Sequence, residues 1–89
     1  MYYVYVLESI KDKYFYIGCT NNLKNRFQLH NSGKVYATKF RRPFKLIYCE
    51  IYLNKNDAFV REKFLKTGWG RNYLKRVLKN YFEAKKLGR

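Results

Sequence analysis

Residues 2–19, YYVYVLESIKDKYFYIGC, contain two short segments that are rich in aromatic and β-branched side chains. These segments, at 2–7 and 14–19, are separated by the largely polar residues 9–13. Aromatic and β-branched residues favour extended strands, and a short polar interval between two such runs is typical of a hairpin. This part of the sequence therefore predicts a β-hairpin.

A short helix, a loop and a third strand are predicted after the hairpin. Polar side chains at 20–22 can cap a helix in which Leu23, Phe27 and His30 recur at helical spacing, until Gly33 permits a left-handed turn. Residues 33–43 have no regular period and predict a basic loop. Residues 44–53 are almost continuously apolar, which predicts a strand covered on both faces and placed inside the sheet.

Two further helices complete the predicted fold. The second helix is capped by residues 54–57 and runs to about Thr67, with Gly68 as its stop and Trp69-Gly70 as the corner. The third is one continuous helix with the apolar stripe Tyr73, Leu74, Val77, Leu78, Tyr81 and Phe82. The expected fold class is α+β: a single domain, residues 1–89, with a small three-stranded antiparallel sheet flanked by helices in the order β-β-α-β-α-α.

The composition favours a polyanionic partner. The 89 residues include 20 Lys and Arg against 6 Asp and Glu, a formal net charge of +14, and 47% hydrophobic residues exclude a disordered basic tail. Anionic membrane is one alternative, but residues 1–4 carry neither a lipidation signal nor the start of a basic amphipathic helix. A charge that serves solubility alone is the other. We therefore expect a nucleic acid as the partner, and no membrane.

The cysteines and the hydropathy pattern favour a cytoplasmic protein. No apolar run approaches the roughly 20 residues that a membrane-spanning helix needs. Cys19 and Cys49 lie in apolar, strand-like stretches, and two cysteines with the single His30 cannot supply four ligands to zinc. We expect both cysteines to be reduced, buried and structural.

One carboxylate lies where a helix is expected to be apolar. Glu62 falls on the side of the second helix that also carries Ala58, Phe59 and Leu65. Burying an ionised carboxylate without a partner is strongly unfavourable. Glu62 is therefore expected to form a structural ion pair with a nearby Arg or Lys, to be protonated, or to bind a cation.

Arg26 and His30 are four residues apart on the first helix and therefore share one face, where they can converge on one point. Each residue also has a purely structural interpretation. His30 can interact with the C-terminal end of the helix dipole, and Arg26 can be a solvated surface charge.

The hairpin tyrosines form same-face pairs, Tyr3 with Tyr5 and Tyr14 with Tyr16. Most of them are expected to be structural, because aromatic side chains pair well across strands. Two hydroxyls could still meet where Gly18 lets another group approach the backbone.

The motifs Tyr3-Val4-Tyr5 and Tyr16-Ile17-Gly18 resemble the pair that names the GIY-YIG nuclease superfamily. Residues 23–30, LKNRFQLH, look like the family's helix with its arginine and a later histidine, and residues 58–63, AFVREK, look like its helix with the metal-binding glutamate. The resemblance covers nearly the whole chain. The chain resembles in particular the small stand-alone bacterial members of the superfamily. Two departures are the first motif, which reads Tyr-Val-Tyr instead of Gly-Ile-Tyr, and Cys19, where some relatives carry a lysine.

The resemblance implies a metal-dependent endonuclease that hydrolyses phosphodiester bonds, with DNA as the expected substrate. Glu62 would hold one divalent cation, Mg²⁺ with Mn²⁺ as a substitute. Either Tyr5 or Tyr16 would take the proton of the attacking water, with Tyr5 the preferred base and Tyr16 orienting water or phosphate. Arg26 and the metal would lower the pKa of the tyrosine that acts as the base, and Arg26 would also stabilise the transition state. His30 would accept or relay the proton.

Contacts with the nucleic-acid backbone are expected from the basic loop and the third helix, through Lys39, Arg41, Arg42, Arg71, Asn72 and Lys75. Nothing in the sequence resembles a recognition helix, so selectivity is expected from strand structure or from a partner protein, with the chain a monomer or weak dimer. The alternatives to a nuclease are a non-catalytic nucleic-acid-binding module that retains the fold and a structural accessory of a larger nucleoprotein.

Overall fold

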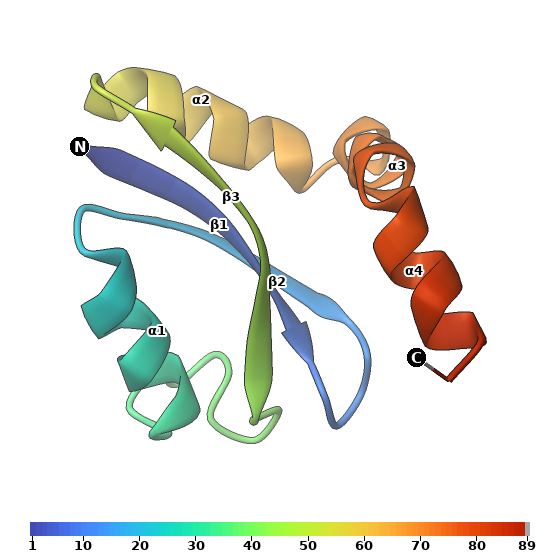
Figure 1. Cartoon of the computed structure of the whole chain (residues 1–89). Coiled ribbons are helices and arrows are strands. Elements are labelled where there is room, and N and C mark those ends of the chain that lie inside the picture. The colour runs from blue at the N-terminus through green and yellow to red at the C-terminus, as the bar shows by residue number, and fades with distance from the viewer. Residues whose placement is uncertain (89) are drawn as a thin grey trace.

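The computed structural model describes residues 1–88, which form three strands and four helices (Figure 1). The strands are β1 (Tyr2–Ser9), β2 (Phe15–Thr20) and β3 (Phe44–Tyr52). The helices are α1 (Leu23–Asn31), α2 (Lys55–Leu65), α3 (Gly68–Val77) and α4 (Lys79–Lys86). The predicted α+β class is confirmed, and the order β-β-α-β-α-α-α contains one helix more than expected.

The sheet is antiparallel with the strand order β2-β1-β3, so β1 is central. Residues 4–9 of β1 are all buried, because the chain covers both faces of this strand. The prediction that the strand at 44–53 lies inside the sheet was wrong. β3 forms an edge. Ile47, Tyr48 and Tyr52 pack against the helices on one face. On the other face Phe44 is buried, whereas Leu46 and Ile51 are exposed.

Two hydrophobic clusters lie on opposite faces of the sheet. Because side chains alternate along a strand, Tyr5 and Leu7 point to one face and Val4 and Val6 to the other. α1 packs on the first face, which we call the tyrosine face. α2 and α3 pack on the second through Ala58, Leu65 and Leu74. Figure 1 shows α1 on its own side of the sheet, away from α2, α3 and α4.

The first helix has the caps that the sequence predicts. The Asn22 side chain accepts a hydrogen bond from the backbone N–H of Asn25 at 3.1 Å. Gly33, just beyond the helix, has a φ of 79°, a left-handed value that glycine adopts without strain.

α3 begins directly after α2 and not after a corner at Trp69-Gly70. Thr67 is its N-cap, and the Thr67 hydroxyl accepts a hydrogen bond from the backbone N–H of Gly70 at 3.1 Å. A Cβ at Gly70 would lie 2.6 Å from the Leu65 carbonyl carbon. The missing side chain therefore lets α3 start against the end of α2. The predicted end of the second helix near Thr67 is close to the observed C-cap Lys66, and only the corner lies earlier than predicted.

The predicted continuous third helix is two helices, which meet at Leu78. The change of direction brings Tyr81 and Lys85 of α4 to Glu8 of β1, which is only 2% exposed. The Tyr81 hydroxyl donates to Glu8 Oε1 at 2.6 Å, and Lys85 forms an ion pair with the same carboxylate. A buried carboxylate needs such partners. This long-range contact with Glu8 explains the bend between α3 and α4.

A second carboxylate fastens β3 to α2. Arg61 donates to both oxygens of Glu50, at 2.8 and 3.0 Å, and the hydroxyls of Tyr48 and Tyr52 donate to the same group. Burial acts to raise the pKa of Glu50, but these hydrogen bonds outweigh it and lower the pKa. Arg61 is thereby directed toward β3. The next residue, Glu62, is turned about 100° away around the helix.

No helix among residues 1–88 combines the length and apolar character that a membrane crossing requires. Cys19 and Cys49 are both free thiols, as expected, although each is half-buried where full burial was predicted. Burial raises the pKa of both.

Candidate active site

Tyr5 lies at the centre of the tyrosine face, 1% exposed, with its ring against Gly18 of β2. A Cβ at position 18 would overlap the Tyr5 hydroxyl and lie 2.6 Å from its Cζ. The ring of Tyr16 is the next aromatic neighbour, with 6.4 Å between the centroids. A glycine is therefore required at position 18, because any side chain there would collide with the ring of Tyr5.

His30 is fully buried at the end of α1 and is hydrogen-bonded through both ring nitrogens. Its Nε2 lies 2.9 Å from the Tyr5 hydroxyl and its Nδ1 lies 2.8 Å from Thr38 Oγ1. We assign Nδ1–H as the donor to Thr38, because the Thr38 hydroxyl can then donate onward to the Val35 carbonyl oxygen, 3.5 Å away. Nε2 then accepts from Tyr5. This network assigns a neutral ring with its proton on Nδ1.

The buried ring makes stability depend on pH. Burial, followed by the positive charge of Arg26, lowers the pKa of His30 to about 4 from 6.5. As the pH falls, the unfolded chain therefore binds a proton at His30 before the folded chain does. The stability that the neutral, buried ring gives the folded state is fully present above pH 6.5 and is lost as the pH falls. We expect the free energy of unfolding in urea to fall by about 2 kcal/mol between pH 6.5 and 4.5.

The carboxyl groups of Glu8 and Glu50, whose pKa values are lowered from 4.5, contribute mainly at the lower end of this window and below it. His30→Gln should therefore give a nearly flat stability profile across it. A wild-type profile that is already flat would contradict a buried neutral histidine.

Thr38 is a positioning residue that sequence interpretation missed. It is fully buried within the loop at 33–43 and supplies the acceptor for His30 Nδ1–H. A threonine in a segment without periodicity carries no local signal of this role. Only the path of the folded loop brings it beneath the ring.

Replacing Thr38 should release the tautomer of His30. In Thr38→Val the ring loses its Nδ1 acceptor, so we expect the Nε2–H tautomer to become populated and the fold to lose about 1–3 kcal/mol. Nitrogen NMR of the ring and urea unfolding measure the two effects. Thr38→Ser keeps the hydroxyl and should restore the wild-type tautomer. An unchanged tautomer in Thr38→Val would remove the positioning role.

Arg26 is half-buried one helical turn before His30, and its guanidinium lies beside Tyr5 and Tyr16. Hydrogen bonding to Tyr5 raises the pKa of Arg26. Burial raises the pKa of Tyr5 and outweighs the opposite effect of Arg26. Arg26 thus favours the phenolate, as expected, but does not by itself bring the pKa of Tyr5 below its ordinary value.

Glu62 lies on α2 at the β2 side of the sheet. Its side chain is 20% exposed, which confirms the half-buried position. After burial, the negative charge of Glu62 is a further cause that raises the pKa of Tyr5 and of Cys19, so it lies near both. Its Oε2 also pairs with Lys66 at 2.7 Å. The ion pair that the sequence left open is therefore present, and the carboxylate still acts on the tyrosine face.

Glu62 would offer a divalent cation one protein carboxylate. Among residues 1–88 no group of three or more His, Cys, Asp or Glu side chains could surround a metal ion. Mg²⁺ commonly keeps several waters and is bound by one or two carboxylates together with substrate phosphates. Glu62 Oε1 makes no hydrogen bond within the described part of the chain and remains open for such a ligand role.

An open groove of about 360 Å³ gives access to Arg26 from solvent. Cys19 lines it from β2, and Lys55 and Phe59 line it from α2. Lys55 is a second cation beside Arg26 that the sequence interpretation did not single out, because nothing local distinguishes it from other lysines. Lys55 lies next to Cys19, the position at which some members of the resembled superfamily carry a lysine.

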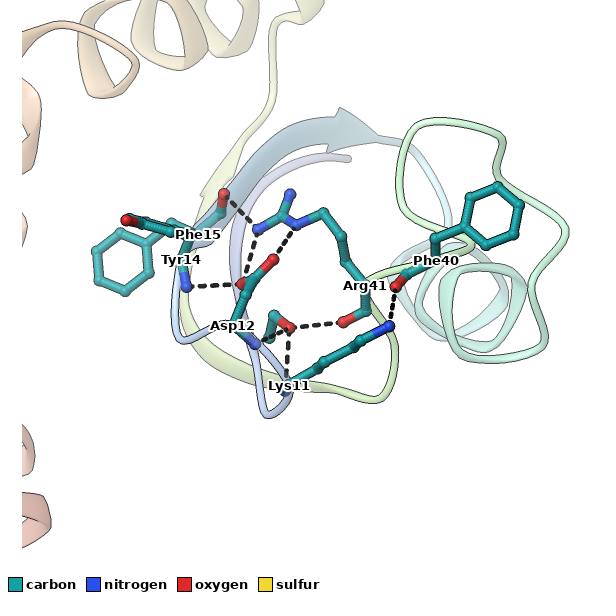
Figure 2. Close-up of polar contacts among 7 residues, drawn as sticks. Lys11, Asp12, Tyr14, Phe15, Phe40 and Arg41 are labelled. Carbon is teal, nitrogen blue, oxygen red and sulfur yellow. Dashed lines mark hydrogen bonds and ion pairs between the residues drawn. The ribbon is translucent and has the colours of Figure 1, made fainter.

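The basic loop is fastened to the hairpin turn by polar contacts (Figure 2). Arg41 donates to Asp12 Oδ2 at 2.7 Å and to the Phe15 carbonyl oxygen at 3.4 Å, while Lys11 donates to the Phe40 carbonyl oxygen at 3.0 Å. The Arg41 guanidinium lowers the pKa of Asp12 to about 2. Arg41, predicted to contact nucleic acid, is thus already engaged by a carboxylate.

The other predicted nucleic-acid contacts of the loop lie at its surface. Lys39 is half-buried, with its ammonium 5.0 Å from the Phe40 ring centroid, and the exposed Arg42 guanidinium lies against Gly33. Neither forms an ion pair with a carboxylate side chain of residues 1–88.

On α3, Arg71, Asn72 and Lys75 are exposed, and Arg71 and Lys75 line a groove beside β2. Asn72 makes no hydrogen bond to the tyrosine face within the described residues. Tyr3 is half-buried and lines a separate hollow with the start of α1. Tyr14 precedes β2 and is 74% exposed, so it does not share a strand face with Tyr16 as predicted.

Similarity to known proteins covers most of the chain. Residues 1–76 match the protein family described as the GIY-YIG catalytic domain. A UPF0213 protein of Clostridium perfringens is 45% identical over 67 residues, which are 74% of this chain and 71% of that protein. A UPF0213 protein of Limosilactobacillus reuteri is 40% identical over 91 aligned residues, covering 99% of this chain and 94% of that protein. One of Syntrophus aciditrophicus is 46% identical over 66 residues, or 72% and 75% of the two chains.

Proposed function

The chain belongs to the GIY-YIG catalytic domain family, and from this premise we propose that it is a metal-dependent endonuclease that hydrolyses phosphodiester bonds in DNA. One observation carries the proposal. Tyr5, Tyr16, Arg26 and His30 gather on the tyrosine face, and the charge of Glu62 reaches the same tyrosine from α2. A carboxylate repels phosphates, so a cation-binding role suits this position better than phosphate binding alone, in addition to the ion pair with Lys66.

Arg26 is proposed to bind the scissile phosphate and to stabilise the charge of its transition state. The planar guanidinium offers several donors and stays protonated, which suits an oxyanion. With the Tyr5 hydroxyl assigned as the donor to His30, its oxygen can accept from Arg26 and so position the guanidinium. Arg26 also lines the open groove between α1 and α2, so a phosphate can reach it.

Tyr16 is proposed as the base that takes the proton of the attacking water. Tyr5, preferred on sequence grounds, is buried and already donates to His30, and burial raises its pKa. Tyr16 is half-buried, not fully buried as Tyr5 is, and has its ring centroid 4.8 Å from that of His30. We therefore assign the water-facing role to Tyr16 and the positioning of Arg26 to Tyr5.

Glu62 is proposed to hold one divalent cation, Mg²⁺ with Mn²⁺ as a substitute. When bound, such an ion supplies Lewis-acid stabilisation of a phosphate and of a departing oxygen. The open Oε1 of Glu62 supports this role. The net charge of +14 supports binding of the polyanion, and the two free cysteines support a cytoplasmic location. We further propose that the protein acts as a monomer or weak dimer and that a partner protein adds selectivity.

Cleavage should depend on added metal. We expect labelled DNA to be cut in Mg²⁺ or Mn²⁺, to stay intact in EDTA, and to be cut again after excess Mg²⁺ is restored. Tyr16→Phe should slow cleavage by about 10²-fold or more, because it removes proton transfer, while binding in EDTA stays unchanged. Single-stranded, duplex and branched DNA and RNA should all be tested. Binding without cleavage of any of them would favour the non-catalytic module.

A further inference from the structure

We propose that a groove along the edge strand β2 binds a single-stranded segment of nucleic acid that flanks the scissile phosphate. The β2 groove, as we call it, lies between β2 and the helices α3 and α4. The inference rests on the proposed nuclease function for its biological meaning. Its physical basis is independent and comes from shape, charge and exposed aromatic surface.

The β2 groove consists of two adjoining hollows of about 580 and about 540 Å³. Lys13, Phe15 and Lys75 line both, so the hollows form one continuous path. The first extends to Tyr16 and Arg71, and the second extends along α4. Figure 1 shows the start of β2 on the side of the sheet that faces α3 and α4.

The walls of the β2 groove are strongly basic. Lys13, Arg71 and Lys75 are exposed and form no ion pair with a carboxylate side chain of residues 1–88. Lys79 and Lys86 add two further cations along α4. The lining carboxylate of Glu8 is already neutralised by its ion pair with α4, which leaves Glu83 as the remaining acidic wall residue. This balance is complementary to a polyanionic chain.

The floor of the groove is apolar and aromatic, which favours a single strand over a duplex. Phe15 and Phe82 are half-buried and stack against each other with 5.8 Å between the ring centroids. Tyr14 on the rim is 74% exposed. A duplex presents its phosphates outward and keeps its bases stacked inside, whereas a single strand can place bases on aromatic rings. Exposed aromatic and apolar surface between lysines matches the second arrangement.

The groove leads to the candidate active site. Tyr16 points to the tyrosine face, while Phe15 and Ile17 point to the opposite face, so the groove wraps around the edge formed by β2. Lys66, also in the lining, is the residue paired with Glu62. A strand that leaves the groove at this end passes both the proposed base and the proposed metal ligand.

Binding in EDTA tests the groove apart from cleavage. The probes are fluorescent 15-nucleotide oligo(dT) and oligo(rU), which separate DNA from RNA, and a duplex hairpin. We expect Tyr14→Ala to weaken single-strand binding roughly ten-fold and duplex binding less than about two-fold. Lys13→Gln with Lys75→Gln should reduce the slope of log affinity against log salt by about 1.4, since each phosphate contact contributes about 0.7.

Matched controls are available on the same fold. Trp69→Ala removes an aromatic side chain that is 79% exposed on α3 and does not line the groove, and Lys63→Gln removes an exposed lysine of α2. Both should bind like wild type. Circular dichroism should show that Tyr14→Ala remains folded, as expected for an exposed residue. Equal losses in the groove variants and these controls, or equal losses for duplex and single strand, overturn the proposal.

Crosslinking locates the strand directly. An oligonucleotide that carries iodouracil should crosslink, on irradiation, to Tyr14 or Phe15, which peptide mass spectrometry identifies. Crosslinks confined to residues outside the groove overturn the proposal. If the groove variants bind normally while the wild type still cuts DNA, the groove fails and the nuclease stands. If they lose binding as expected while the wild type never cuts, the nuclease fails and the groove stands.

Discussion

Glu62→Gln should lower the rate of metal-dependent cleavage by about 10³-fold while binding in EDTA stays close to that of wild type. The amide keeps the size of the carboxylate but loses the charge that a divalent cation requires. Unfolding should account for little of the loss, because the i,i+4 ion pair with Lys66 contributes only about 0.5 kcal/mol. Single-turnover cleavage at saturating protein, over a range of Mg²⁺ concentrations, measures the effect.

Asp57→Asn is the control for this substitution. It also removes a carboxylate from α2, but at an exposed position in the first turn that lines none of the grooves around the site. We expect its cleavage rate to remain within about two-fold of wild type, since surface substitutions of this kind change little. Glu62→Gln with an undiminished rate at every Mg²⁺ concentration would exclude Glu62 as the metal ligand.

Gly18→Ala should destabilise the fold by about 2–3 kcal/mol, because a single added methyl group meets a ring that cannot move away. The Cβ would overlap the Tyr5 hydroxyl and lie 2.6 Å from Cζ. Tyr5 is 1% exposed and its hydroxyl is held by His30, so relief requires the strands to separate or that hydrogen bond to break. In a chain of this size we expect the Tm to fall by roughly 10–20 °C.

Gly68→Ala is the matched control, because a Cβ there would meet nothing within 4 Å. At the first position of α3 alanine should be neutral or raise the Tm slightly, since it favours helix more than glycine does. Thermal unfolding of both variants decides the matter. A Gly18→Ala protein that melts within about 2 °C of wild type would show that Tyr5 is not packed against β2 in solution.

Much of the local structure could be predicted from the sequence. The hairpin, the Asn22 cap, the left-handed Gly33 and the half-buried position of Glu62 follow from interactions between residues close in the chain. Strand alternation and helical spacing also indicated that tyrosines, Arg26 and His30 could meet, because each pattern directs side chains to a known face.

Other features could not be predicted, because they depend on partners far apart in the sequence. A central β1 and an edge β3 differ in how many strands flank them, and both segments are equally apolar. The bend at Leu78 depends on Glu8, which lies 73 residues from the Tyr81 that binds it. The engagement of Arg41 by Asp12, 29 residues earlier, likewise has no local signal.

The α+β class, the basic charge, the resemblance to a nuclease family and the residue types near the first two strands all follow from the sequence. The separate roles of those residues depend on the folded chain. Burial and the His30 hydrogen bond withdraw Tyr5 from water, Thr38 sets the histidine tautomer, and β2 becomes the edge of a basic aromatic groove. Periodicity shows which face a side chain joins, whereas burial and hydrogen-bond partners depend on what the rest of the chain places against that face.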